Sequence, residues 1–175
     1  MLSNNEKEAT IVEVTINGEV RSLVGNPPAV GEEMPHFKVF DKNDEKIKTR
    51  FLFGKPTLIS VVPDINTSVC SIQTKKFNEE VDKYTGANFL TVSTNTIADQ
   101  QKWCAAENVE HMQLVSDHEE SFGYALKLLI PEEGILARSV WVMDAEGKIT
   151  YREICPEIVA EPDYDAAIAA LKQLL

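Results

Sequence analysis

The sequence predicts a single-domain α/β protein built on a mixed sheet, with a short β-hairpin added at its N-terminal end. Between residues 57 and 129, apolar β-branched runs alternate with stretches of helical period, as in parallel strands joined by helices. Two strand-like runs around a turn and a last amphipathic stretch follow them. A length of 175 residues is enough for one sizeable core, so we expect residues 1–175 to form one domain.

The N-terminal hairpin is expected over about residues 9–24. Apolar residues alternate from Ile11 to Ile16, and Asn17-Gly18 then supplies the positive φ angles of a tight turn before the chain returns towards Leu23. A further short strand is expected at 37–40, followed by a charged turn over residues 42–46.

The centre of the sheet is predicted at residues 57–62, the run TLISVV between Pro56 and Pro63. Such an apolar, β-branched run is typical of a strand covered on both faces. A helix is expected over 68–84, and a second strand over 89–92. This order makes a right-handed parallel crossover unit.

The remaining elements complete the prediction. They are a helix over 97–106, a strand over 112–115, a helix over 119–129, a hairpin pairing 139–143 with 149–154, and a helix over 163–175 with an apolar stripe. A parallel unit followed by an antiparallel hairpin and a closing helix is the order of a thioredoxin-like fold.

Composition excludes several classes of function. The net charge of −11, from 17 basic and 28 acidic residues, opposes binding to nucleic acid and to anionic membranes. The first residues, MLSNNEKEAT, carry neither an apolar secretory signal nor a basic amphipathic leader, so we expect a cytoplasmic protein. Its thiols should then rest reduced.

Three cysteines, Cys70, Cys104 and Cys155, are too few and too scattered for a structural disulfide framework. The three histidines, His36, His111 and His118, form no spaced cluster with them, and no Cys-x-x-Cys is present. We therefore expect no metal site, and no nicotinamide or flavin motif indicates a bound cofactor.

Cys70 occupies the position best suited to chemistry. It lies between the carboxyl end of a buried strand and the first turn of a helix, where ligands bind in open α/β sheets. Free N–H groups and the helix dipole stabilise a thiolate there, and the thiolate is the reactive form. The alternative interpretation is that Cys70 is a small apolar residue filling space at the helix start.

The residues from Pro63 to Cys70 resemble the Pro-x-x-x-Thr-x-x-Cys signature of the peroxiredoxins. The continuation CSIQTKKFNEE, the segment TVSTNTIADQQKWCAAENV and the ending PEIVAEPDYDAA are similar to the thiol peroxidase subfamily. The resemblance covers roughly residues 10–175, most specifically 57–171, and implies a peroxiredoxin-type thioredoxin-like fold.

The resemblance implies a role for each matching residue. Cys70 would be the nucleophile that attacks a peroxide, Thr67 the hydroxyl that orients peroxide and thiolate, and Pro63 the shield of the pocket. Arg138, in ILARSV, would be the cation beside the thiolate, where a guanidinium presents several donors and polarises the oxygen–oxygen bond. Without the motif, Arg138 would be interpreted as a solvated residue at the start of a strand.

Peroxide attack leaves a sulfenic acid, which condenses with a second thiol to form a disulfide. The resemblance assigns that thiol to Cys104, which from the pattern alone could equally be a buried core cysteine; Cys155 is interpreted as packing. Cysteines on separate helices are expected to lie beyond the roughly 7 Å between α-carbons that a disulfide allows, so local unfolding is implied. Recycling would require a dithiol reductant such as thioredoxin.

Departures from the family pattern concern rate rather than chemistry. Asp64, Asn66 and Ser68 stand where the family commonly has serine, aspartate and proline, and Ala105 follows Cys104 where glycine is usual. An inward carboxylate at Asp64 would oppose charge on the thiolate.

The resemblance also implies a homodimer that reduces hydrogen peroxide and organic hydroperoxides in antioxidant defence. Two alternatives remain open at this point. One is a thioredoxin-like redox sensor or binding module without efficient turnover, and the other is a structural dimer module with inert thiols.

Overall fold

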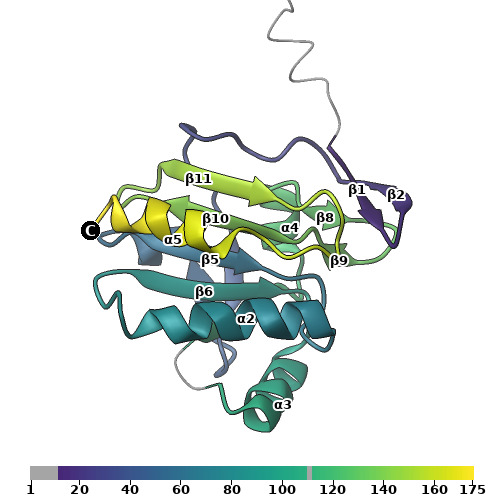
Figure 1. Ribbon diagram of the computed structural model, residues 1–175, viewed down its shortest axis with the longest axis horizontal. Coiled ribbons are helices and arrows are strands. Elements are labelled where there is room, and N and C mark those ends of the chain that lie inside the picture. Colours follow the sequence, from purple (N-terminus) through teal and green to yellow (C-terminus); the bar gives the residue numbers. More distant parts are fainter. Residues whose placement is uncertain (1–11, 110–111) are drawn as a thin grey trace, which may run out of the picture.

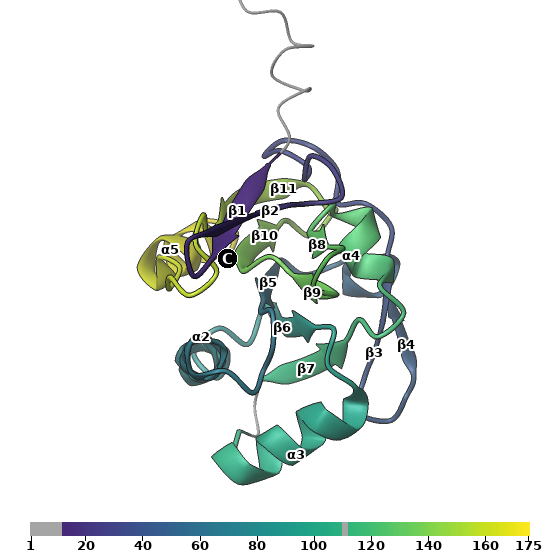
Figure 2. The same cartoon turned by 90° about the vertical axis from the view of Figure 1, so that its right-hand side faces the viewer.

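The computed structural model describes residues 12–109 and 112–175 and shows the α/β architecture that the sequence predicts. Three expectations fall wholly or partly outside these residues: the leader segment MLSNNEKEAT, the first residues of the hairpin, and His111. Helices lie on both faces of one twisted sheet, and the two views in Figures 1 and 2 show this layered arrangement.

The main sheet has seven strands in the order β11-β10-β5-β6-β7-β3-β4. Strands β5, β6 and β7 are parallel, whereas the pairs β10–β5, β10–β11, β3–β7 and β3–β4 are antiparallel. The strands are β3 (Lys38–Phe40), β4 (Lys46–Lys48), β5 (Thr57–Val61), β6 (Asn88–Ser93), β7 (Gln113–Ser116), β10 (Ser139–Met143) and β11 (Ile149–Ile154). The predicted hairpin of β10 and β11 is confirmed at the same bounds.

Alternation along β5 explains why the sheet is covered on both faces. All five of its residues are buried. Leu58 belongs to one apolar cluster, while Ile59 and Val61 belong to the other. A strand whose successive side chains point to opposite faces must bury both when each face is apolar. The sequence TLISVV therefore specifies a central strand.

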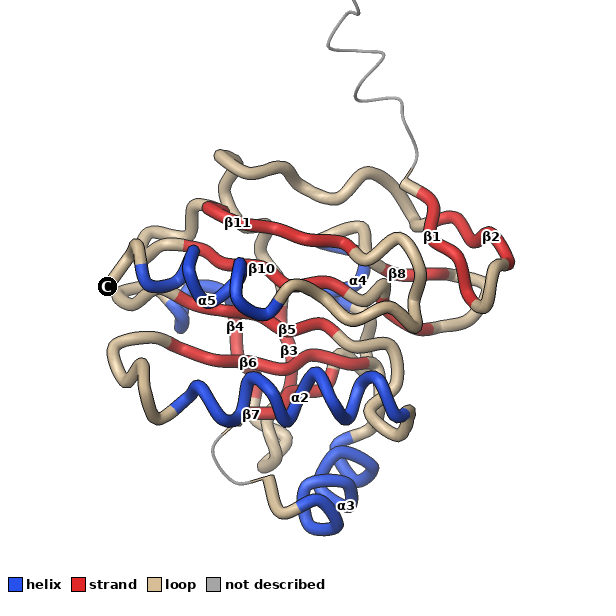
Figure 3. Tube along the Cα trace, in the orientation of Figure 1, coloured by secondary structure: helices blue, strands red, loops and turns tan. Residues whose placement is uncertain are grey.

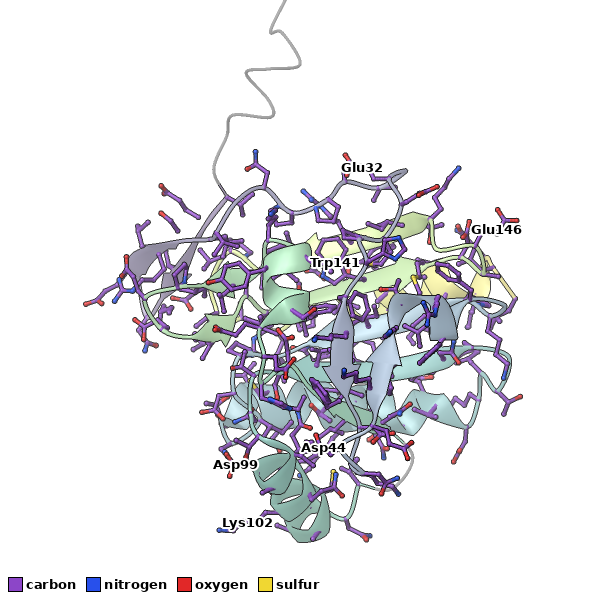
Figure 4. All side chains as sticks on the ribbon, turned by 180° about the vertical axis from the view of Figure 1, so that it is seen from behind. Glu32, Asp44, Asp99, Lys102, Trp141 and Glu146 are labelled. Atoms are coloured by element: carbon purple, nitrogen blue, oxygen red, sulfur yellow. The ribbon has the colours of Figure 1, made fainter. Side chains whose placement is uncertain are left out.

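Two helices, α2 (Ser68–Val81) and α5 (Tyr164–Lys172), cover one face, and α3 (Ile97–Glu107) lies below β7 in Figure 2 and adds Trp103 to the apolar cluster of that face. Each begins at a residue with an extended backbone, and the Thr96 and Asp163 side chains accept N–H bonds that cap α3 and α5. The other face packs Trp141, seen from behind in Figure 4, in one cluster with residues of α4 (Ser121–Ala125) and of the small hairpin of β8 (Leu129–Ile130) and β9 (Ile135–Leu136).

The N-terminal hairpin is confirmed within the described residues as β1 (Glu13–Ile16) paired with β2 (Glu19–Ser22). Asn17 and Gly18 connect them with φ angles of 51° and 85°, as the Asn-Gly signal predicts. The hairpin is docked onto the segment after β11. The Gly18 N–H donates to the Glu157 carboxylate at 2.8 Å, and Thr15 exchanges backbone hydrogen bonds with residues 156 and 158.

The predicted helix over 119–129 is wrong in its second half. Helix α4 ends at Ala125, and Lys127 adopts a left-handed backbone with φ 60°, which terminates the helix. The apolar run continues because Leu128 to Ile130 are buried in coil and strand rather than on a helix face. Figure 3 shows α4 as a short helix behind the sheet, separate from β8.

Four short elements were not expected: the paired strands β8 and β9, the strand β4, which begins at the last residue of the charged turn predicted over 42–46, and the 3-10 turn η1 (Thr49–Leu52). The charged pattern hid β4 because none of its three residues is fully buried. Over the described ranges, none of the helices has the length and apolar character required to cross a bilayer.

Candidate active site

The candidate site is built where β5 ends and α2 begins. In Figure 1 this end of β5, the start of α2 and the β1–β2 hairpin lie at the same right-hand end of the molecule, which Figure 2 views directly. Cys70 is the third residue of α2 and is fully buried. A thiol at this position faces the helix N-terminus, whose unpaired N–H groups favour a negative charge.

The loop before α2 is ordered by its own hydrogen bonds. The backbone oxygen of Asp64 accepts bonds from both the N–H and the hydroxyl of Thr67, at 3.0 and 2.9 Å. The Asp64 carboxylate accepts the Asn66 N–H at 3.0 Å. Because the Thr67 hydroxyl donates its proton to Asp64, its oxygen remains able to accept a hydrogen bond. Pro63, the residue before Asp64, is buried.

Arg138 reaches the sulfur of Cys70 from the residue before β10. Its side chain is 2% exposed, and its Nη2 donates to the Cys70 Sγ at 3.2 Å. Its Nη1 donates to the Gln73 Oε1 at 3.0 Å, and its Nε donates to the backbone oxygen of Ile158. The interpretation as a solvated arginine is therefore excluded, and a buried guanidinium held by three acceptors faces the thiol.

Gln73 completes this arrangement, and sequence reasoning missed it. It is fully buried one turn after Cys70, and its amide nitrogen donates to the Ser60 hydroxyl at 2.8 Å and to the Val61 backbone oxygen at 3.3 Å. Its amide oxygen is thereby turned towards Arg138. The available signal was a polar residue at helical spacing from Cys70 on the face that the sheet buries.

A pocket of about 280 Å³ opens beside these residues, and Pro63, Thr67 and Arg138 all line it. Its other walls are largely apolar, and the N-terminal hairpin contributes Ile16 and Asn17 to them. The remaining lining residues are Asp64, Ser68, Val69, Ile135, Ile158 and Val159.

Cys104 lies apart from this pocket, on α3. It is half-buried and lines a separate pocket of about 470 Å³ with Lys42 and Gln101. Burial raises the pKa of the Cys104 thiol, and the positive charge of Lys42 opposes that shift. Cys104 packs against the same apolar cluster that contains Cys70 and Trp103. Cys70 and Cys104 thus contact one apolar cluster without being bonded to each other, and all three cysteines are free thiols.

Cys155 is buried at the end of β11, and its N–H donates to the backbone oxygen of Arg138. Burial raises the pKa of the Cys155 thiol to about 11, with Glu153 adding to the shift and Arg138 opposing it. A thiol held in its neutral form is a poor nucleophile. Cys155 thus combines a packed position with low reactivity.

The residues that depart from the family pattern leave this geometry intact. Asn66 and Ser68 are exposed. One oxygen of the Asp64 carboxylate accepts hydrogen bonds from both the Asn66 N–H and the Asn95 side chain. Over residues 12–109 and 112–175, no group of three or more His, Cys, Asp or Glu residues is arranged to hold a metal ion.

The chain is similar to known proteins over most of its length. Residues 30–152 match the model of the AhpC/TSA family. The thiol peroxidase of Listeria innocua is 43% identical over 93% of this chain and 99% of its own, and that of Bacillus subtilis is 39% identical over 94% and 99%. The crystal structure of a peroxiredoxin-like protein from Aquifex aeolicus, 32% identical, superimposes with a TM-score of 0.85 over 94% of this chain and 98% of that one.

Proposed function

The chain belongs to the AhpC/TSA family and is a thiol-dependent peroxidase, and on that premise we propose that Cys70 is the nucleophile that attacks the peroxide. The observation that carries this proposal is the 3.2 Å contact between the Arg138 guanidinium and the sulfur of Cys70, beside a pocket at the helix start. Neither Cys104 nor Cys155 has a guanidinium hydrogen-bonded to its sulfur among the contacts of the described residues.

In the proposed first step, the Cys70 thiolate attacks the terminal oxygen of the hydroperoxide. The sulfur–oxygen bond forms as the oxygen–oxygen bond breaks, Cys70 is oxidised to a sulfenic acid, and the departing oxygen leaves as water or an alcohol after taking a proton. Arg138 stabilises the thiolate and the charge that moves onto the leaving oxygen. Thr67, whose oxygen can still accept, orients the peroxide O–H.

Pro63 and the apolar walls of the pocket shape access to Cys70. Hydrogen peroxide and small organic hydroperoxides both fit a volume of about 280 Å³. Apolar side chains from the hairpin and from residues 158 and 159 give an alkyl group a surface to contact, which supports organic hydroperoxides as substrates.

Cys104 is proposed as the resolving thiol. Its sulfur attacks the Cys70 sulfenic acid, the sulfur–sulfur bond forms, the sulfur–oxygen bond breaks, and the oxygen leaves with the thiol proton as water. Since Cys70 is fully buried on α2 and Cys104 lies on a different helix, α3, the first turns around them must open before the bond can form. Cys155 takes no part.

A thiol reductant must then return the disulfide to two thiols. We propose thioredoxin or a similar dithiol protein for this step, because the reaction consumes two electrons and the chain has no motif for a redox cofactor. We further propose that residues 1–175 form one domain that acts in the cytoplasm as a homodimer. Light scattering at micromolar protein concentration tests the dimer.

Peptide mapping tests the chemistry directly. The reduced protein receives one equivalent of peroxide, the remaining thiols are alkylated, and the peptides are identified by mass spectrometry. A Cys70–Cys104 disulfide with Cys155 alkylated is the expected product. Cys70→Ser should abolish turnover, whereas Cys104→Ser should allow one round of peroxide reduction and then stop.

Other products would change the assignment. A different disulfide would move the resolving role to another thiol, and comparable turnover in either serine variant would remove the role of the residue replaced. Cys155→Ser is the matched control and should turn over with thioredoxin as the wild type does. A wild-type protein that reacts once and is not recycled would be a redox sensor instead.

A further inference from the structure

Two side chains tie the Cys70 loop to the beginning of α3. The Asn95 amide nitrogen donates to the Asp64 carboxylate at 3.0 Å, and the Asn95 amide oxygen accepts the Ile65 N–H at 2.9 Å. Asn95 directly precedes Thr96, the capping residue of α3, and its own carbonyl accepts the Ser116 hydroxyl. The loop before Cys70 is thus fastened to a point that is itself anchored on β7.

This pair lies where the two halves of the catalytic machinery meet. Ile65, which donates its N–H to Asn95, is fully buried in the apolar cluster that contains Cys70 and Trp103. Cys104 packs against the same cluster. Asp64 and Asn95 are half-buried, so water competes only partly for their bond. A pocket of about 500 Å³ lies between the loop, which contributes Asn66, and α3, which contributes Trp103.

We propose that the Asp64–Asn95 pair is a positioning element that holds the Cys70 loop against α3 and thereby limits the rate at which Cys104 closes the disulfide. The proposal rests on the proposed function of the two cysteines. While the pair is intact, Cys70 remains buried beside Arg138, in the geometry that favours attack on peroxide. Breaking the pair frees the loop at one end and raises the population of the opened form that disulfide formation needs.

The pairing was not recognised from the sequence, because Asp64 and Asn95 are 31 positions apart and each is an ordinary turn residue by itself. The chemistry of the pair is specific nonetheless. The bond needs an N–H donor at residue 95 and an oxygen acceptor at residue 64; two carboxylates repel, whereas an amide at residue 64 can still present its oxygen to the Asn95 amide nitrogen.

That chemistry gives a test by loss and conservation of the acceptor. Asn95→Asp keeps an acceptor for the Ile65 N–H but faces the Asp64 carboxylate with a second one, and Asp64→Ala removes the acceptor at residue 64. Each of these two variants should close the Cys70–Cys104 disulfide about tenfold faster, the effect of losing one hydrogen bond to a charged group. Asp64→Asn keeps an amide oxygen that can accept from both the Asn66 N–H and the Asn95 amide, and it should close the disulfide at near the wild-type rate.

Closure is followed after one equivalent of hydrogen peroxide by acid quench, alkylation and mass spectrometry of the Cys70 and Cys104 peptides. The same samples give the rate of the first oxidation of Cys70, which in Asn95→Asp, a change at a residue outside the pocket lining, should stay within about twofold of the wild type if the closed form still predominates. With excess peroxide, faster closure should also leave less Cys70 as sulfinic acid, since a second peroxide competes for the sulfenic acid. Gln173→Glu, which adds the same charge on exposed chain, controls for net charge.

The outcomes separate the two levels of the argument. If the wild type forms no Cys70–Cys104 disulfide, the proposed resolving role fails. If the disulfide forms but Asn95→Asp and Asp64→Ala both close it at the wild-type rate, or if Asp64→Asn is as fast as they are, the positioning role of the pair is refuted. Should Asn95→Asp fail to fold by circular dichroism, the comparison of Asp64→Ala with Asp64→Asn still decides the matter.

Discussion

Replacing Arg138 tests whether its guanidinium stabilises the charge on Cys70. The 3.2 Å separation between Nη2 and Sγ corresponds to about 5 kcal/mol of attraction at an effective dielectric constant of about 20, an upper value for the loss. A hydrogen bond to a charged group contributes about 1.5–3 kcal/mol net, or roughly 10- to 150-fold in rate. We expect Arg138→Gln to slow the first oxidation of Cys70 within that range.

Arg138→Lys should slow the same step by about tenfold. It keeps the charge, but an ammonium lacks the planar fork that serves Cys70, Gln73 and Ile158 together. The assay is rapid mixing of reduced protein with substoichiometric peroxide, acid quench and mapping of Cys70. Oxidation within twofold of the wild type in a folded Arg138→Gln protein would refute the role of the guanidinium.

A matched control separates rate from stability. Arg152 lies on the neighbouring strand β11, and its side chain also bonds backbone carbonyls, those of Pro27 and Pro28. Arg152→Gln should therefore lower the unfolding temperature without slowing Cys70 oxidation. A comparable loss of rate in this variant would show that the effect at Arg138 is one of general destabilisation.

Two further predictions follow from pKa shifts. Lys42→Gln should raise the pKa of Cys104 further, because Lys42 opposes the effect of burial. Disulfide closure at pH 7 should then slow by about two- to fivefold, while the rate of Cys70 oxidation stays unchanged. Equal closure rates in the variant and the wild type from pH 6 to 9 would contradict this. Burial raises the pKa of Asp117 to about 7 from an ordinary value of 3.8, against the N–H bonds from Phe122 and Gly123 that favour its charged form. The folded state therefore binds the proton more tightly than the unfolded state. In urea titrations, the free energy of unfolding of the wild type should fall relative to that of Asp117→Asn as the pH rises from about 4 to 8. A difference that stays constant over this pH range would be inconsistent with the raised pKa.

Much of the fold could be predicted because the signals were local. Asn17-Gly18 determines its turn through backbone preferences of two residues, and the apolar run of β5 identifies a strand that only a central position can bury. The hairpin of β10 and β11 combined both kinds of signal and was predicted at its observed bounds. The helix predicted over 119–129 was wrong after Ala125, because burial in coil and burial on a helix face leave the same apolar pattern in the sequence.

The site residues also differ in whether local sequence determines their contacts. Pro63, Thr67 and Cys70 belong to one short motif, so their proximity is a property of the loop itself. Arg138 was matched to the family by its surroundings, yet its partner Gln73 carried no motif and its contact with Cys70 spans 68 positions. Such contacts are set by strand register, which pairs Ser139 with Val61, and register is a property of the assembled sheet.

The same register explains why the two proposed steps make opposite demands on the protein. Pairing of β10 with β5 brings Arg138 to the end of β5, where Gln73 fixes it between the sheet and α2, so the charge on Cys70 meets donors that need no rearrangement. That rigidity also buries Cys70 completely, out of reach of a thiol on another helix. The proposed disulfide closure therefore calls for a contact that holds the loop but not the guanidinium, and the bond between Asp64 and Asn95 meets that condition.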